Sequence, residues 1–125
     1  MAKKLGYADG TSVFAVGMPA SVKAEIAEGA KLRFAVKAAK GQAVAHVFAT
    51  EAKVLEAELK KLRRLLAPAG MVWVSWPKKA AKVETDITED AIRKIALPMG
   101  YVDVKVCAVD ETWSGLKLVI RKSER

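Results

Sequence analysis

The sequence predicts an α/β fold in three layers, in which helices cover both faces of a mostly parallel sheet of about six strands. Short apolar segments alternate with segments of helical periodicity along the chain. The first apolar run, residues 12–17, is continuous, as in a strand buried on both faces. The last two apolar segments are joined by a turn so short that only an antiparallel hairpin fits. With 125 residues, 52% of them hydrophobic, we expect one domain over residues 1–125.

The first half of the chain predicts three strands and two helices. The strands are expected at residues 12–17, 32–36 and 43–49. A short helix over 22–28, capped by Ser21, lies between the first two strands. The second helix is the clearest element, because apolar residues recur at helical spacing over 54–66 while charged residues fill the other face. Thr50 is the expected N-cap of that helix.

The second half predicts three more strands and one helix. The strands are expected at residues 71–76, 101–107 and 116–121. Asp86, followed three residues later by Glu89, has the spacing of a capping box and predicts a helix start. The middle strand of the three alternates apolar and polar residues, which is typical of a strand near a sheet edge. This alternation places Val102, Val104 and Val106 on one face.

Right-handed crossovers limit how these elements can be wound into a sheet. The simplest arrangement is a Rossmann-like sheet of strand order 2-1-3-4-6-5, with the sixth strand antiparallel between the fourth and the fifth. Ligands in such sheets bind outside the carboxyl ends of the strands, where the strand order reverses. The sequence therefore predicts a ligand-binding rim, which also includes Thr50 and Glu51 after the third strand. Its candidate residues are Gly17, Met18, Pro19, Trp76, Lys78, Lys79, Asp110, Trp113 and Ser114.

The tryptophans of this rim admit two interpretations. Trp76 ends the fourth strand and Trp113 lies in the predicted hairpin loop, so the two indoles could meet across the rim. An aromatic pair beside Lys78 and Lys79 would suit stacking on a planar, anionic ligand such as a nucleotide. In the alternative interpretation the indoles cover the end of the core and the lysines face water.

Three stretches carry resemblances to known families. The passage LAPAGMVWV (66–74) and the closing antiparallel hairpin resemble class I methyltransferases. The stretches GMVWVSWPKKAAKVETDITED (70–90) and LPMGYVDVKVCAVDETWSGLKLVIRK (97–122) resemble a family of small bacterial proteins classed as a domain of unknown function. The likeness covers most of the chain and implies a trimmed methyltransferase-like fold, shorter than the full fold by one helix and one strand.

The methyltransferase resemblance implies two contacts to S-adenosylmethionine. In that fold a glycine-rich turn follows strand one, and an acidic residue at the end of strand two holds the ribose. This sequence has Gly17-Met18-Pro19 at the first place and Lys37 at the second. A single glycine does not bring several backbone N–H groups to a ligand, and a lysine replaces the hydrogen-bond acceptor. We therefore expect no cofactor and no catalytic residue.

The main functional prediction is a non-catalytic module that binds a small molecule or a protein partner. The first alternative is an S-adenosylmethionine-dependent methyltransferase-like cofactor binder. The second is nonspecific binding of nucleic acid, because 22 Lys and Arg against 14 Asp and Glu give a basic protein with a net charge of +8. No segment of the chain holds a basic tail, so the charge permits this binding without locating it.

Cysteine and histidine usage excludes several site classes. The lone Cys107 forms no internal disulfide, and with His46 as the lone histidine there is no cluster for zinc. His46 is expected to be a hydrogen-bonded core residue with no Ser or Cys neighbour to activate, and Cys107 an unreactive thiol. No apolar run reaches the length of a membrane span or a secretory signal, which predicts a cytoplasmic protein that does not enter the membrane.

Overall fold

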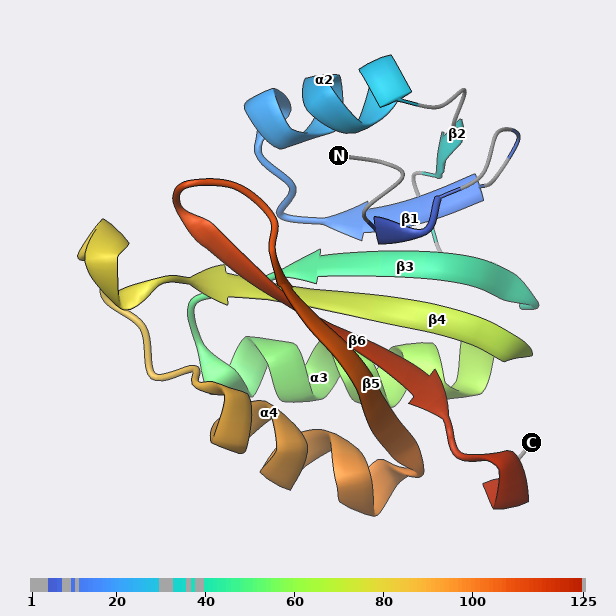
Figure 1. Ribbon diagram of the computed structural model, residues 1–125. Helices are drawn as coiled ribbons and strands as arrows, with labels where there is room; N and C mark the ends of the chain where they lie inside the picture. Colours follow the sequence, from blue (N-terminus) through green and yellow to red (C-terminus); the bar gives the residue numbers. More distant parts are fainter. Residues whose placement is uncertain are drawn as a thin grey trace.

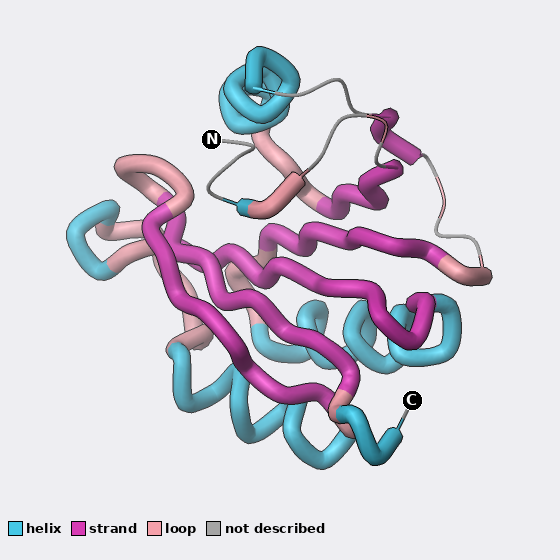
Figure 2. Tube along the Cα trace, turned by 45° about the vertical axis from the view of Figure 1, so that its right-hand side comes forward, coloured by secondary structure: helices cyan, strands magenta, loops and turns pink. Residues whose placement is uncertain are grey.

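A six-stranded sheet lies between two helical layers in the computed structural model, which describes residues 5–7, 10, 12–29, 33–35, 37 and 40–124 (Figure 1). Helix α2 (Ala20–Gly29) covers one face, and α3 (Ala52–Leu65) and α4 (Glu89–Ala96) cover the other, as Figure 2 shows from a second direction. The strands are β1 (Ser12–Val16), β2 (Arg33–Ala35), β3 (Gln42–Phe48), β4 (Leu66–Pro77), β5 (Tyr101–Ala108) and β6 (Trp113–Ile120).

The sheet topology confirms the predicted fold class. The strand order is β2-β1-β3-β4-β6-β5. The pairs β1–β2, β1–β3 and β3–β4 are parallel, whereas β6 is antiparallel to both β4 and β5. Strand β4 begins at Leu66, directly after α3, and not at the predicted residue 71, because Leu66 pairs with Gln42 of β3 ahead of the main ladder.

The apolar residues form one cluster on each face of the sheet. On the side of α3 and α4, the helix side chains Leu55, Leu59 and Leu62 pack against Val72 and Val74 of β4, and all five are fully buried. On the side of α2, a second cluster of buried apolar residues surrounds the indole of Trp73 in β4. Its members include Leu5, Tyr7, Val13, Val22, Ile26, Val44 and Trp73. Both faces of β4 are therefore covered, which explains why its sequence is apolar apart from Ser75.

The helices do not begin where the capping signals predict. The Pro19 carbonyl accepts the first helical hydrogen bond of α2 from the Lys23 N–H at 3.0 Å, so Ser21 lies inside the first turn. The N-cap of α4 is Thr88, whose hydroxyl accepts a hydrogen bond from the Ala91 N–H at 3.1 Å. The predicted caps at Ser21 and Asp86 are therefore wrong, because a residue two positions away lies at the start of the helix in each case.

Asp86 caps a different helix. Its Oδ1 accepts a hydrogen bond from the Ala52 N–H at 2.7 Å, at the start of α3. Thr50, the predicted cap of α3, instead offers its carbonyl to the Thr85 hydroxyl at 2.6 Å and to the Asp86 N–H at 3.3 Å. The segment before α4 is thus fastened to the segment before α3, and this fixes the loops at that end of the sheet.

Replacing the Asp86 carboxylate tests this cross-chain cap. Asp86→Ala leaves the Ala52 N–H without its protein acceptor and is expected to lower the free energy of unfolding by about 1 kcal/mol. Asp86→Asn keeps a side-chain oxygen that can accept the same bond, so we expect a smaller loss. Urea unfolding measures both. Equal stability of Asp86→Ala and the unaltered chain would show that the cap contributes nothing.

Edge strand β5 contains an irregularity that the alternation does not predict. Asp103 pairs with Leu118 and Lys105 with Lys117, so Val104 is the extra residue of a bulge. Val102 pairs with Val119 and Val106 with Leu116, and these partners lie on opposite faces of β6. The prediction that the three valines share a face is therefore wrong. Val104 and Val106 are 53% and 45% exposed.

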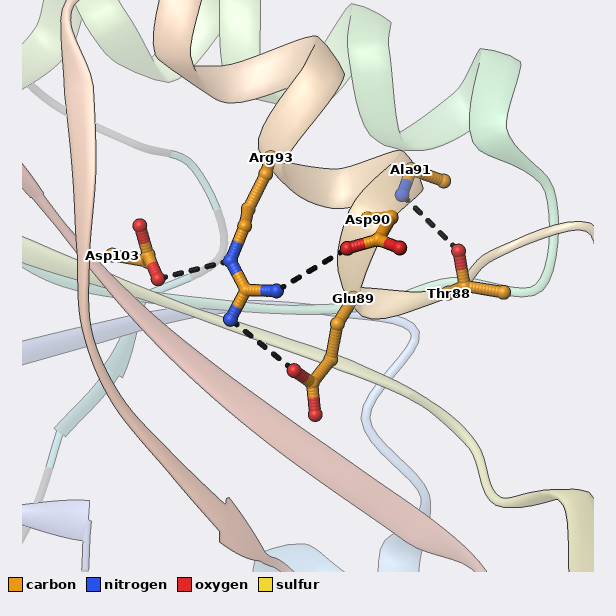
Figure 3. A network of polar contacts seen from close by, with 6 residues as sticks. All are labelled: Thr88, Glu89, Asp90, Ala91, Arg93 and Asp103. Atoms are coloured by element: carbon orange, nitrogen blue, oxygen red, sulfur yellow. Dashed lines mark hydrogen bonds and ion pairs between the residues drawn. The ribbon is translucent and has the colours of Figure 1, made fainter.

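An ion-pair network joins α4 to β5 (Figure 3). Arg93 donates from Nε to Asp103 at 3.0 Å and from Nη2 to Glu89 at 3.2 Å, and its Nη1 lies 3.5 Å from Asp90. The hydrogen bond to Asp103 is the main cause that raises the pKa of Arg93 above its ordinary value. Glu89 is consequently held toward Arg93 and its charge is balanced there.

Candidate functional site at the carboxyl ends of the strands

The carboxyl ends of β1, β3 and β4 lie at one edge of the sheet, where their arrowheads point the same way in Figure 1. The order reverses between β1, which leads through α2 to β2, and β3, which leads through α3 to β4. Three cavities follow this edge, of about 290 Å³ at β1 and β2, about 420 Å³ after β3 and about 510 Å³ after β4. Thr85 lines both the second and the third, so these two adjoin.

The β1–β2 cavity contains Gly17 and Met18 of the predicted rim. Gly17 has a φ of 66°, and a Cβ at this position would lie 2.8 Å from the backbone oxygen of Phe48. The absence of a side chain at Gly17 therefore lets β3 approach closely, while the residue itself stays exposed at the cavity. Lys23 also lines this cavity, with its Nζ 4.7 Å from the centre of the Phe34 ring, and no carboxylate belongs to the described lining.

The β3 cavity is acidic and is lined by Thr50, Glu51, Glu84, Thr85 and Asp86. Asp86 and Thr85 are already bonded to the start of α3, as described above. Glu51 and Glu84 are exposed, and among the described residues neither carboxylate forms a hydrogen bond or ion pair. The sequence indicates Glu51 through its place after β3. It gives no comparable signal for Glu84, which lies before α4 and reaches the cavity only because the two loops are fastened together.

The β4 cavity gathers four of the predicted rim residues. Trp76, Lys78, Lys79 and Ser114 all line it. The Lys78 N–H donates to the Thr112 carbonyl at 2.8 Å, which ties the chain after β4 to the loop between β5 and β6. Lys78 is half-buried and Lys79 is exposed. Of the remaining predicted residues, Pro19 lies directly before α2 and accepts its first helical hydrogen bond.

The two tryptophans do not meet. Trp76 is 8% exposed and packs in the cluster under α3 and α4. Trp113 lies in β6, not in a loop, and pairs with Pro77, whereas Trp76 pairs with Ser114. Neighbouring residues of a strand point to opposite faces, so the indole of Trp113 lies on the α2 side, with its ring 5.0 Å from that of Phe48. The first interpretation, an aromatic pair across the rim, is therefore wrong, and Trp76 packs in the core as the alternative expects.

Asp110 is also used within the fold. Its Oδ1 accepts hydrogen bonds from the N–H groups of Thr112 at 2.9 Å and Trp113 at 2.8 Å. A carboxylate that bonds the backbone two and three residues ahead stabilises a turn. Asp110 therefore shapes the hairpin loop that holds Lys78.

A buried polar chain runs beneath the rim on the α2 side. His46 Nδ1 lies 2.8 Å from the Tyr7 hydroxyl, and Nε2 lies 2.7 Å from the Ser75 hydroxyl. The imidazole is fully buried and stacks on Phe48 with a centroid distance of 4.4 Å. Burial lowers the pKa of His46 to about 3 and raises the pKa of Tyr7. The prediction of a hydrogen-bonded core histidine is confirmed, although the expectation that it has no serine neighbour is wrong.

The described part of the chain limits two further site classes. None of its helices is both long and apolar enough to cross a membrane. Within the same residues, no three His, Cys, Asp or Glu side chains are grouped to hold a metal ion. Cys107 is half-buried and unpaired with any other cysteine.

No family model matches the chain, and no curated protein matches it. Among solved structures it is similar to PigF with SAH, at a TM-score of 0.63 and 8% identity over 88% of this chain. It spans 56% of PigF's length. It is also similar to a SAM-dependent methyltransferase from Aquifex aeolicus. The TM-score is 0.63 at 16% identity, and the match covers 94% of this chain and 86% of that one.

A third similar structure is magnesium protoporphyrin IX methyltransferase from Synechocystis PCC 6803 with bound SAM. The TM-score is 0.65 at 11% identity, and the match covers 96% of this chain and 74% of that one. Similarity at such low identity establishes the fold alone. The chain therefore has the Rossmann-like fold of the S-adenosylmethionine-dependent methyltransferases.

Proposed function

We propose that this chain is a methyltransferase-like domain that binds a cofactor of the S-adenosylmethionine type at the carboxyl-end rim. The shared fold favours this function over the non-catalytic binding module that the sequence predicts, because the similar structures include PigF with SAH and the Synechocystis enzyme with bound SAM. Sheets of this class bind ligands where the strand order reverses, and the β3 cavity adjoins that point.

The β1–β2 end does not fit the cofactor in the way that the methyltransferase resemblance implies. Gly17 is exposed at this cavity, but it is a single glycine, and the close approach that it allows is to the backbone oxygen of Phe48. Lys37 follows β2 at the place of the acidic residue. The ribose hydroxyls would find no carboxylate acceptor in the described lining there.

The acidic β3 cavity is the observation that carries the proposal. S-Adenosylmethionine bears a sulfonium and an ammonium group, and its ribose and adenine present hydrogen-bond donors. Glu51 and Glu84 offer carboxylates with no other partner among the described residues, in a cavity of about 420 Å³. Carboxylates accept strong charge-assisted hydrogen bonds and favour nearby cations. The two glutamates would thus bind and orient the cofactor from β3, in place of an acid after β2.

When bound, S-adenosylmethionine supplies a transferable methyl group. The residues of this chain would bind and orient the cofactor. Glu51 and Glu84 would neutralise its positive charges, and the hydroxyl groups of Thr50 and Thr85 line the same cavity. The Asp86 bond to Ala52 keeps the two acidic segments together. This linkage makes the cavity a property of the folded chain and not of either loop alone.

Titration calorimetry with S-adenosylmethionine and S-adenosylhomocysteine tests the proposal. We expect both compounds to bind. We expect the double substitution Glu51→Gln and Glu84→Gln to lower the affinity for S-adenosylmethionine by about tenfold or more. The loss should be smaller for S-adenosylhomocysteine, because that molecule lacks the sulfonium charge.

Exposed glutamates elsewhere provide the matched control. Glu28→Gln with Glu56→Gln makes the same change of net charge on α2 and α3, away from the cavity lining. This variant should bind like the unaltered chain. Absence of binding by either adenosyl compound, or equal weakening by both double variants, would contradict the proposed cofactor site.

A further inference from the structure

We infer that the β4 cavity takes an anionic substrate with an apolar body, its carboxylate or phosphate group lying at Lys78 and Lys79. This inference rests on the proposed function and names the substrate class for the neighbouring cavity. The cavity measures about 510 Å³, which suits a molecule the size of a substituted aromatic acid.

Two cations with no partner supply the anion site. Among the described residues neither Lys78 nor Lys79 forms an ion pair, and both line the cavity. The backbone below them is fixed, because Lys78 is bonded to Thr112 and its carbonyl accepts the Ala81 N–H at 3.0 Å. The short helix η1 (Lys79–Ala81) then ends at Lys82, which has a φ of 54°. Lysines on such a fixed turn can meet an anion without first ordering a loop.

Two other features of the cavity could affect an anion, namely the Glu89 carboxylate and the start of α4. Glu89 also lines it, but its carboxylate is bonded to Arg93 at 3.2 Å. At the start of α4 the Thr88 hydroxyl already accepts the hydrogen bond of the Ala91 N–H. The positive charge available to a ligand is therefore that of the two lysines, and the Ser114 hydroxyl lies on the same wall as a further donor.

Apolar side chains form much of the remaining wall. Trp76 and Ile87, which belong to the buried cluster under α3 and α4, line the cavity. Val83 lines it too and is 43% exposed. An exposed valine beside a cavity loses contact with water when an apolar ligand enters. The lining therefore favours an organic anion over an inorganic ion.

The two adjoining cavities have opposite charges. Glu51 and Glu84 border the β3 cavity, the lysines border the β4 cavity, and Thr85 lies between them. A cationic cofactor in the first and an anionic substrate in the second would attract each other at the shared wall. The segment 78–88 supplies residues to both cavities, so it would set their relative placement.

The test uses three probes of one shape: 1-naphthoate, 1-naphthyl phosphate and the neutral 1-naphthamide. Nuclear magnetic resonance of the ¹⁵N-labelled chain should show saturable shifts at Lys78, Thr88 and Ser114 with the anions. We expect the neutral amide to bind about tenfold more weakly than the anions. The double substitution Lys78→Ala and Lys79→Ala should lower the affinity for the anions by about tenfold. The ratio of naphthoate to naphthyl phosphate affinity distinguishes a carboxylate site from a phosphate site.

Lys60→Ala with Lys61→Ala is the matched control, since these exposed neighbours lie on α3 outside the cavity. It should leave anion binding unchanged, and thermal unfolding checks that both variants fold. Equal affinity for the neutral amide, or equal weakening by the two double variants, would overturn the inference. S-Adenosylmethionine binding is measured on the same samples: if it persists while the anions fail, the substrate class alone is wrong, and if it fails while the anions bind, the proposed cofactor is wrong.

Discussion

Acidification from pH 7 to pH 5 is expected to lower the free energy of unfolding by about 2 kcal/mol through His46 alone. The imidazole is fully buried, and burial lowers its pKa from 6.5 to about 3. The unfolded chain therefore takes up the proton first as the pH falls. This stabilisation is complete above pH 6.5 and is lost progressively toward pH 3.

Urea unfolding at several pH values between 7 and 5 measures this effect. His46 is the lone histidine of the chain, and ordinary carboxylates titrate mainly below this range. His46→Gln removes the titrating group and disturbs the bonds to Tyr7 and Ser75, so it should be less stable at pH 7 by about 1 to 3 kcal/mol. It should also lose most of the pH dependence. A flat profile in the unaltered chain would contradict the burial of a neutral His46.

Gly17→Ala is expected to cost about 3 kcal/mol of stability, more than an ordinary glycine replacement. The position has a φ of 66°, which L side chains rarely adopt, and a Cβ would lie 2.8 Å from the Phe48 backbone oxygen. That oxygen belongs to β3, which is paired on both sides and cannot give way easily. The substitution should therefore strain the point where the strand order reverses.

Gly41→Ala separates the two causes of this loss. Gly41 has a φ of 86° and no atom within 4 Å of the added Cβ, so only the backbone conformation is penalised, by about 1 kcal/mol. Urea unfolding of both variants gives the difference. Equal losses would mean that β1 and β3 do not approach as closely at Gly17 as described.

The strand order could be predicted because local patterns and connection lengths determine it. Continuous apolar runs indicate covered strands, and the short link of 109–112 between β5 and β6 allows only an antiparallel pair. The helix of 54–66 was predicted within a few residues because its apolar stripe faces the sheet. These signals lie within single segments of the chain.

What the sequence did not predict depends on contacts between distant segments. Asp86 has the spacing of a cap for α4 but bonds Ala52, since Thr88 fills the nearer position. Trp113 resembles a loop residue beside Ser114 and Gly115, yet its ring packs on Phe48 and the strand extends to include it. In each case a tertiary contact decides between two locally acceptable structures.

The structure places cavities along the predicted edge of the sheet, and these cavities gather part of the predicted rim. The rim and the lysines after β4 follow from strand order alone, and Lys78, Lys79 and Ser114 do line one cavity. The acidic cavity combines Glu51 with Glu84, which are far apart in the sequence and meet because the loops before α3 and α4 are bonded together. No spacing rule links such a pair.

Titration of the ¹⁵N-labelled chain with S-adenosylmethionine is the most direct test of the proposed function. The account predicts saturable amide shifts at Glu51 and over 84–86, with smaller shifts at Gly17, and the loss of those shifts in the Glu51→Gln, Glu84→Gln variant. Absence of saturable shifts up to about 1 mM, the upper end of usual enzyme affinities, would contradict it. Shifts confined to the β1–β2 cavity would likewise contradict a cofactor held by the glutamates after β3.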